Sequence, residues 1–316
     1  MESPLFKVIT EALGNKVRTA KVYSASIRRV HKQVYKKPLE DSKLAFLRTT
    51  KTINFVRKIV NLTERKNAAT GMLMGAKATG APEKVVGKYR EIMMGADKDY
   101  QKFLSSGKRK RPFKNAEKEW KSILELHKKV AAEIQARRLF DLGSQVSPAE
   151  YRVLMAWLYL KWVTSLPPRR LEYANTRLVT REEYAKSDKT DNYVVMGPRK
   201  WTWNVHDYKT AGKYGPQTLP IPGPLKAALN RIRPITKSKN QKGFLFLNNK
   251  YRNISRSQFS SFVKWVFRTY LGKAFTQNTL RSIKISSVWS PSQEDPLKLA
   301  AAMGHDIKTA LLHYKV

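Results

Sequence analysis

Residues 147–172 read SPAEYRVLMAWLYLKWVTSLPPRRLE, and the predicted fold is organised around this stretch. Ser147 suits the N-cap of a helix, Pro148 its first position and Glu150 its third, which together predict where a helix begins. The helix is expected to run to about Ser165, because a proline disfavours helical backbone in the residue before it. An apolar helix is therefore predicted to end just before a pair of arginines.

The sequence after this helix changes its hydrophobic period and predicts an α+β domain over residues 141–316. Short runs rich in β-branched and aromatic residues are typical of strands, and the segment 206–216 carries Gly212 and Gly215, as a hairpin loop does. We expect a mainly helical domain with a small antiparallel sheet. The predicted strands are Tyr193–Met196, Lys200–Val205, Thr218–Ile221 and Gly243–Leu247, and the predicted later helices are Ser257–Tyr270, Thr279–Ser287, Pro296–Met303 and Ile307–Tyr314.

The sequence before residue 141 predicts an all-α domain over residues 1–140. Apolar residues recur at helical spacing in Ser42–Leu62 and again in Asn115–Phe140, and Val22–Val34 is a basic stretch with some amphipathic character. The Gly/Ala-rich segment Gly71–Pro82 is expected to break the helices, and Asp141–Gln145 reads as a linker.

The charge of the chain is its strongest compositional signal. With 62 Lys and Arg against 24 Asp and Glu, the net charge is +38, shared between residues 1–150 (+18) and 151–316 (+20). Each half would repel itself unless a polyanion lay against it, and nucleic acid gains affinity by releasing counterions. An anionic membrane is the rival polyanion, but the sequence has neither a convincing membrane-surface helix nor a lipidation motif. Composition therefore favours a nucleic acid as the partner.

The chain has no cysteine, which excludes disulfides and thiolate zinc sites. Its most apolar window, 154–166, is interrupted by Lys161, and the first residues, MESP, do not resemble a secretion signal. We expect an intracellular protein that is not secreted and does not cross a membrane. The segment Gly107–Pro112, GKRKRP, reads either as a nuclear import signal or as a phosphate-contacting turn.

Four short clusters carry residues capable of phosphate chemistry. Each has an ordinary structural interpretation when taken alone, such as a surface arginine or a packed tyrosine. Their order along the chain is what gives them weight. They are Arg169-Arg170-Leu171-Glu172 after the apolar helix, Tyr208-Lys209-Thr210 in the hairpin loop, Asn278-Thr279-Leu280-Arg281, and Met303-Gly304-His305 followed nine residues later by Tyr314.

This ordered set resembles the signature of the tyrosine recombinase (integrase) family over residues 145–316. Arg with Glu at +3, a hairpin lysine, x-x-Leu-Arg, Met-Gly-His and a later Tyr occur in the family's order, and Met303–Tyr314 is the most specific segment. The resemblance implies that residues 141–316 form the catalytic domain and that residues 1–140 form a helical core-binding domain, in which Thr19–Lys32 is similar to the opening helix. It also implies a C-shaped clamp around double-stranded DNA, with self-association into dimers or tetramers on the DNA.

The resemblance further implies a role for each residue in cutting and rejoining DNA through a 3′-phosphotyrosyl intermediate. Tyr314 is the nucleophile, Arg169 and Arg281 bind the non-bridging oxygens through their planar forks, and His305 is a further donor. Lys209 protonates the leaving 5′-oxygen, with Lys213 as the alternative in the same loop, and Glu172 orients an arginine. No cofactor and no metal is expected, because the arginines neutralise the phosphate.

One position departs from the family pattern: Asn278 stands where a histidine is usual, and an amide cannot carry a proton as imidazole does. The expected function is integration or excision of a viral or other mobile element. Two alternatives share this site, a type IB topoisomerase-like DNA-relaxing enzyme and a catalytically impaired, recombinase-derived DNA-binding protein. A third, a general basic RNA- or chromatin-binding protein, would make the ordered set a coincidence.

Overall fold

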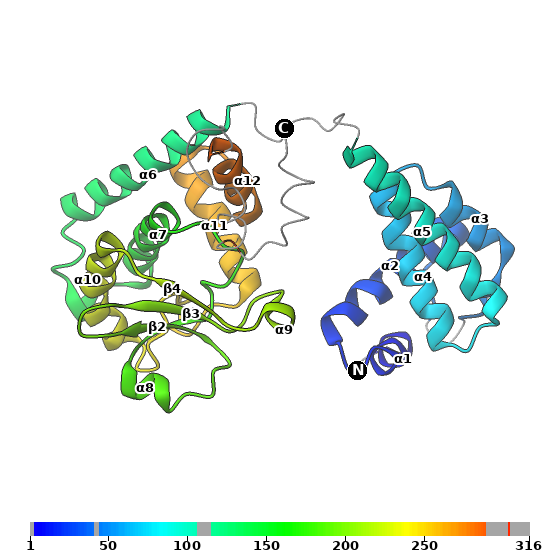
Figure 1. Cartoon of the computed structure of the whole chain (residues 1–316), viewed down its shortest axis with the longest axis horizontal. Helices are drawn as coiled ribbons and strands as arrows, with labels where there is room; N and C mark the ends of the chain where they lie inside the picture. Colours follow the sequence, from blue (N-terminus) through cyan, green and yellow to red (C-terminus); the bar gives the residue numbers. More distant parts are fainter. Residues whose placement is uncertain (1–2, 41–43, 106–114, 289–302, 304–316) are drawn as a thin grey trace. The chain divides into compact units, whose positions relative to one another are not determined.

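The computed structural model of the protein describes residues 3–40, 44–105, 115–288 and 303. The chain divides into two compact units, Met1–Lys110 and Arg111–Val316, which are described separately below (Figure 1). Within the described residues the protein is mainly helical and carries one small sheet, as predicted. None of its described helices combines the length and the apolar character needed to cross a bilayer.

The N-terminal unit is built of helices throughout its described residues, in keeping with the prediction for this region. They are α1 (Pro4–Ala12), α2 (Val17–Tyr35), the 3-10 turn η1 (Leu44–Arg48), α3 (Thr50–Lys58), α4 (Leu62–Ala78) and α5 (Glu83–Ser105). The stretch 42–62, where apolar residues recur at helical spacing, contains η1 and α3, and the Thr49 side chain caps α3 by accepting a hydrogen bond from the Thr52 backbone. Ile53 and Val56 are buried as predicted, but Val60 follows the end of α3 and is 88% exposed.

The predicted break at Gly71–Pro82 is confirmed only at its end, between α4 and α5, because α4 continues through both Gly71 and Gly75. A Cβ atom on Gly71 would lie 2.9 Å from the Ser26 Cβ, and one on Gly75 would lie 2.7 Å from the Ile27 Cδ1. The two glycines therefore let α4 approach α2 closely, and their lower helix propensity is offset by this packing. The chain leaves the helix only after Ala78, where Gly80 adopts a φ of +61°.

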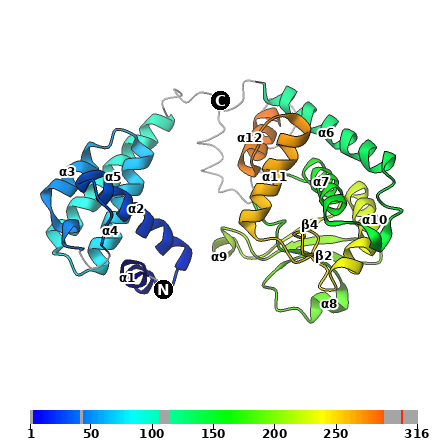
Figure 2. The ribbon, with the colours of Figure 1, turned by 180° about the vertical axis from the view of Figure 1, so that it is seen from behind.

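The C-terminal unit is assembled around α7 (Pro148–Ser165), most of whose side chains are buried. The predicted start is confirmed, since Ser147 and Glu150 form a capping box with Pro148 at the first turn. In both views α7 lies among α6 (Ala116–Ala136), α10 (Gly223–Lys239) and α11 (Arg256–Leu271) (Figure 1 and Figure 2). The remaining helices are η2 (Gly143–Gln145), α8 (Arg181–Ala185), α9 (Ala211–Tyr214) and α12 (Gln277–Val288).

The sheet has the order β1-β2-β3-β4 and is mixed, so the predicted antiparallel sheet is wrong in one pair. The strands are β1 (Thr176–Thr180), β2 (Asn192–Met196), β3 (Thr202–Val205) and β4 (Gln217–Pro220). β2, β3 and β4 pair antiparallel, but β1, which was not predicted, pairs parallel with β2 in the register Thr176↔Asn192. Parallel neighbours need a crossover, which the segment containing α8 supplies.

The fourth predicted strand, Gly243–Leu247, is also wrong. This segment lies beside β1 but makes only isolated bridges, Arg177↔Phe244 and Leu247↔Asn253. Gly243, at a φ of +75°, accepts a hydrogen bond from the Leu178 amide at 2.8 Å, and a Cβ at this position would lie 2.6 Å from the Leu178 oxygen. The turn needed for this close approach prevents a regular ladder.

The chain divides into its two compact units between residues 110 and 111, earlier than the domain boundary expected near residue 140. That boundary assigned α6 to the helical N-terminal domain. In the structure the apolar stripe of α6, including Ile123, Leu126 and Val130, belongs to the same buried core as α7. The periodicity of α6 predicted its buried face but could not indicate which unit covers that face.

The later helices follow the prediction where they are described. α11 and α12 contain the expected segments Ser257–Tyr270 and Thr279–Ser287. Of Pro296–Met303 only Met303 is described, and its side chain is buried; Ile307–Tyr314 and the basic segment Gly107–Pro112 lie outside the described residues.

Candidate functional site

Three buried charged side chains define the candidate site. Among the residues that the structure describes, only Arg169, Glu172 and Arg281 are buried Asp, Glu, Lys or Arg, at 0%, 4% and 1% exposure. Removing a charge from water costs free energy, so such side chains are uncommon unless the fold or a ligand compensates them. All three belong to the set predicted from the sequence, and together they carry two positive charges and one negative charge.

Arg169 lies in the turn that follows α7, and its backbone is held from two sides. Its amide donates to the Tyr173 hydroxyl at 2.9 Å, and its carbonyl accepts from the Gln277 Nε2 at 2.5 Å. Gln277 is the first residue of α12, and its own Oε1 accepts from the buried Tyr159 hydroxyl. Arg169 is therefore tied to the helix that carries Asn278 and Arg281.

The Arg169 side chain is held by the β3–β4 hairpin. Its Nη1 donates to the Gln217 Oε1 at 2.7 Å, and its guanidinium carbon lies 5.3 Å from the Tyr208 ring centroid and 5.9 Å from that of Trp203. Burial lowers the pKa of Arg169, and the Glu172 carboxylate opposes that shift. The guanidinium remains charged, because an arginine starts from a pKa so high that such a shift does not neutralise it.

Arg281 and Asn278 lie on α12 with opposite exposure. Arg281 points inward, where its Nη2 donates to the Met303 carbonyl at 3.0 Å, whereas Asn278, in the first turn, is exposed. Burial raises the pKa of Tyr173, and the positive charges of Arg169 and Arg281 both oppose that shift. Both guanidiniums therefore act electrostatically on the same buried phenol.

The loop lysines Lys209 and Lys213 are exposed. Lys209 directly follows Tyr208, whose ring faces Arg169 and whose hydroxyl donates to the Gly215 carbonyl at 2.6 Å. Lys213 lies in the short helix α9 of the same loop, with its Nζ 4.9 Å from the Tyr214 ring centroid. The predicted hairpin is confirmed, and it brings the base of the lysine loop against Arg169.

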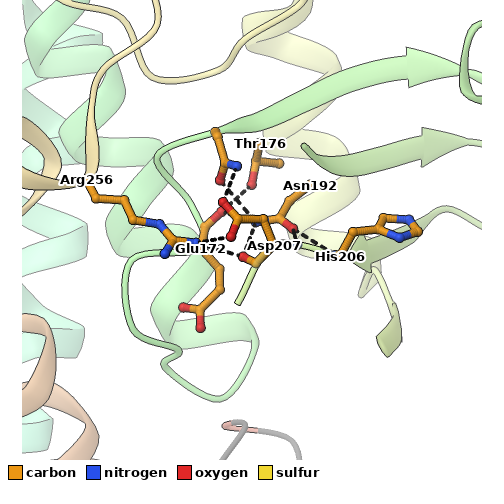
Figure 3. A network of polar contacts seen from close by, with 7 residues as sticks. Glu172, Thr176, Asn192, His206, Asp207 and Arg256 are labelled. Carbon is orange, nitrogen blue, oxygen red and sulfur yellow. Dashed lines mark hydrogen bonds and ion pairs between the residues drawn. The ribbon is translucent and has the colours of Figure 1, made fainter. Parts of the chain in front are cut away.

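A polar network fixes the start of this loop to the turn that carries Glu172 (Figure 3). The Asn192 Oδ1 accepts from the backbone amides of His206 and Asp207, both at 2.8 Å. Its Nδ2 donates to the Glu172 carbonyl at 2.8 Å, so one side chain joins the two segments. Arg256, from the start of α11, holds Asp207 with an Nη2–Oδ1 distance of 2.7 Å.

The Glu172 carboxylate takes no part in that network, because the contacts drawn in Figure 3 use its carbonyl and the carboxylate points away. Its Oε2 is buried and accepts no hydrogen bond from the described residues. Its charge nevertheless acts electrostatically on Arg169, and the expected role of orienting an arginine stays a prediction.

His305 and Tyr314 lie outside the described residues, so their predicted roles stay predictions. No group of three or more His, Cys, Asp or Glu suited to a metal ion occurs in the described part of the chain.

Sequence reasoning missed the residues that hold the predicted ones in place. Asp207 and Gln277 had a weak signal, since each directly precedes a predicted cluster. Gln217 and Asn192 had none, because their roles arise from the sheet pairing that brings distant segments together.

In comparisons with known proteins, no family model matches the chain and no curated protein matches it either.

Proposed function

We propose that this protein cuts and rejoins DNA strands as a tyrosine recombinase does, with Tyr314 as the nucleophile. The observation that carries the proposal is that Arg169, Glu172 and Arg281 are the buried Asp, Glu, Lys or Arg side chains of the described residues. The resemblance to the tyrosine recombinase family selected these residues from the sequence before their burial was known. Two buried guanidiniums beside one carboxylate leave a net positive charge, which suits a phosphodiester.

The chemistry divides among the side chains as follows. The Tyr314 hydroxyl releases its proton to solvent as its oxygen attacks the phosphorus, the bond to the 5′-oxygen breaks, and the DNA 3′-phosphate stays attached to the tyrosine. Arg169 and Arg281 bind the non-bridging oxygens as negative charge develops, and fixed donors of this kind need no reorganisation during the step. His305 is a further donor to the same phosphate.

The leaving 5′-oxygen needs a proton, which the Lys209 ammonium supplies, with Lys213 as the alternative donor in the loop. Rejoining reverses these steps, since the phosphotyrosine conserves the energy of the broken bond. The reaction as written draws only on side chains of the protein and needs no separate cofactor.

We further propose that the partner is double-stranded DNA and that several copies assemble on it to exchange strands of a mobile element. The support is the charge of +38, distributed over both halves of the chain. In the N-terminal unit, α2 exposes Lys21, Arg29, Lys32 and the adjoining Lys36. Phosphate contacts from such residues would give affinity and register without reading the bases. The proposed core-binding role of this unit and the clamp around the duplex rest on the same argument.

The test is incubation with a nicked suicide duplex carrying an end of the element, followed by a denaturing gel. Wild-type protein should shift by the mass of the attached DNA strand, and Tyr314→Phe should lose the shifted band while still binding DNA. A shifted band that survives in Tyr314→Phe would reject this nucleophile.

A catalytically impaired DNA-binding protein is the second candidate, and the exposed Asn278 is the observation that favours it. The amide can donate a hydrogen bond to a phosphate but cannot transfer a proton at neutral pH. The same gel separates the two functions, because an impaired protein binds the duplex and gives no covalent band. Relaxation of a plasmid without a cognate site would instead indicate the type IB topoisomerase-like activity.

A further inference from the structure

The β3–β4 hairpin contacts Arg169 from both ends of its loop. At the far end, Gln217 accepts a hydrogen bond from the Arg169 Nη1 at 2.7 Å. At the near end, the Tyr208 ring lies against the guanidinium, and the loop is closed by the hydrogen bond from its hydroxyl to the Gly215 carbonyl. Gln217 is the first residue of β4 and pairs with Val205 on β3, so the strand ladder fixes its position.

The acceptor that Gln217 offers is neutral, and this matters for the charge of the site. A carboxylate in its place would form an ion pair with Arg169 and offset the charge that attracts a phosphate. Among the described residues Glu172 is the one buried carboxylate, beside the two buried guanidiniums. An amide acceptor therefore holds the arginine without removing the net positive charge.

The contact also selects which edge of the guanidinium can bind a phosphate. An arginine binds an oxyanion bidentately along one edge of its planar fork. Because Gln217 engages Nη1, a bidentate phosphate is directed to the edge formed by Nε and Nη2.

We propose, on the basis of the function proposed above, that Gln217 is a positioning residue for Arg169. Its Oε1 fixes the guanidinium through Nη1, presents the Nε–Nη2 edge to the scissile phosphate and leaves the positive charge intact. Because Gln217 lies at the end of the loop that carries Lys209, it also fixes the position of the arginine relative to the loop of the proton donor.

Three variants test the assignment. Gln217→Met keeps the length of the side chain and removes the acceptor, whereas Gln217→Glu keeps an acceptor and adds a negative charge. Thr218→Val is the matched control, because the neighbouring Thr218 hydroxyl donates to Asn204 at 2.8 Å and does not contact Arg169. For each variant, the single-turnover rate of covalent complex formation on the suicide duplex is measured with the DNA dissociation constant and the melting temperature.

We expect Gln217→Met to slow covalent complex formation by about tenfold, with the dissociation constant changed by less than about twofold. Gln217→Glu should be slower still, because its charge opposes phosphate binding at Arg169, and Thr218→Val should react at the wild-type rate. A loss of DNA affinity in proportion to the loss of rate, or a wild-type rate in Gln217→Met, would overturn the assignment.

A double-mutant cycle separates positioning from a general structural effect. In an Arg169→Ala background, Gln217→Met should cause no further loss of rate, because the group that it positions is gone. An undiminished tenfold loss in that background would overturn the assignment. Absence of a covalent product with the wild-type protein rejects the proposed function and this inference together, whereas a Tyr314-dependent product that is insensitive to Gln217 rejects only the inference.

Discussion

Arg169 and Lys209 carry the same charge and are proposed to serve the same phosphate, but the fold holds them differently. Arg169 is fully buried, and Tyr173, Gln277 and Gln217 hold its amide, carbonyl and Nη1, respectively. Lys209 is exposed in a hairpin loop, next to Tyr208, whose ring lies against the Arg169 guanidinium. The Arg169 guanidinium is held in place by the fold, whereas the Lys209 ammonium lies at the end of a flexible four-carbon side chain.

This difference matches what each group has to do. Donors stabilise a developing negative charge most when they are already oriented and shielded from water. For a buried arginine, the free-energy cost of removing the guanidinium from water is met during folding, before any reaction. A general acid has to meet a leaving oxygen that moves away from the phosphorus, and a long, mobile side chain suits that task. The buried arginines and the loop lysines should therefore respond differently to substitution.

The largest effect is expected at the buried arginines. Arg169→Ala or Arg281→Ala should slow covalent complex formation by about 10²–10³-fold, because each removes a preorganised donor to the developing charge. DNA affinity should change far less, since the protein carries a net charge of +38. Rates on the suicide duplex and filter binding at one salt concentration measure the two quantities.

Arg170→Ala is the control for the arginine variants, because this neighbour is only partly buried and should react almost normally. Equal losses of binding and cleavage in Arg169→Ala or Arg281→Ala would remove the distinction between the buried and the exposed cations.

Substitution of the loop lysine should give the next largest loss of cleavage rate, and a modified substrate should restore that rate. Lys209→Ala should slow cleavage by about 10²-fold, the lower range for loss of a general acid. A duplex with sulfur in place of the bridging 5′-oxygen should restore the rate, because a thiolate leaves without protonation. Arg169→Ala should gain little from the same substrate. If Lys213→Ala shows this rescue instead, Lys213 is the acid.

Asn192→Leu tests the comparison between Arg169 and Lys209 without replacing either residue. It disturbs the start of the loop between β3 and β4. The Asn192 side chain accepts from the His206 and Asp207 backbone amides and donates to the Glu172 carbonyl, so its loss removes three hydrogen bonds and leaves the two amides without this acceptor. The free energy of unfolding should fall by about 1–3 kcal/mol in urea titration. The cleavage rate should also fall, because the loop is no longer fixed to the turn that carries Glu172. An unchanged free energy of unfolding would contradict the role of the network.

The smallest effect is expected at the start of α7. Ser147→Ala removes one partner of the capping box and should lower the free energy of unfolding by about 1 kcal/mol. Its cleavage rate should stay normal, because 18 helical residues, or about 27 Å of helix, separate it from the arginine turn. A slower rate in fully folded protein would contradict this separation, because it would show that the cap also influences the arginine turn.

The sequence predicted best what depends on local chemistry. Proline and a capping box fixed the start of α7, and family-like spacing selected Arg169, Glu172 and Arg281 before their burial was known. It failed where tertiary contacts decide: Gly71 and Gly75 continue a helix because α2 packs on them, and Gly243 turns beside β1 in place of forming a strand. Gln217 could not be found in advance, because its importance comes from a partner 48 residues away.

The parallel pairing of β1 with β2 decides which edge of the sheet carries the candidate site. Thr176, at the start of β1, lies opposite Asn192, at the start of β2, and the antiparallel β3 ends at Val205 on the same side. The turn entering β1 and the loop leaving β3 therefore emerge from one rim of the sheet. With β1 antiparallel to β2, the turn that carries Arg169 would enter the sheet at the opposite rim from the loop that carries Lys209.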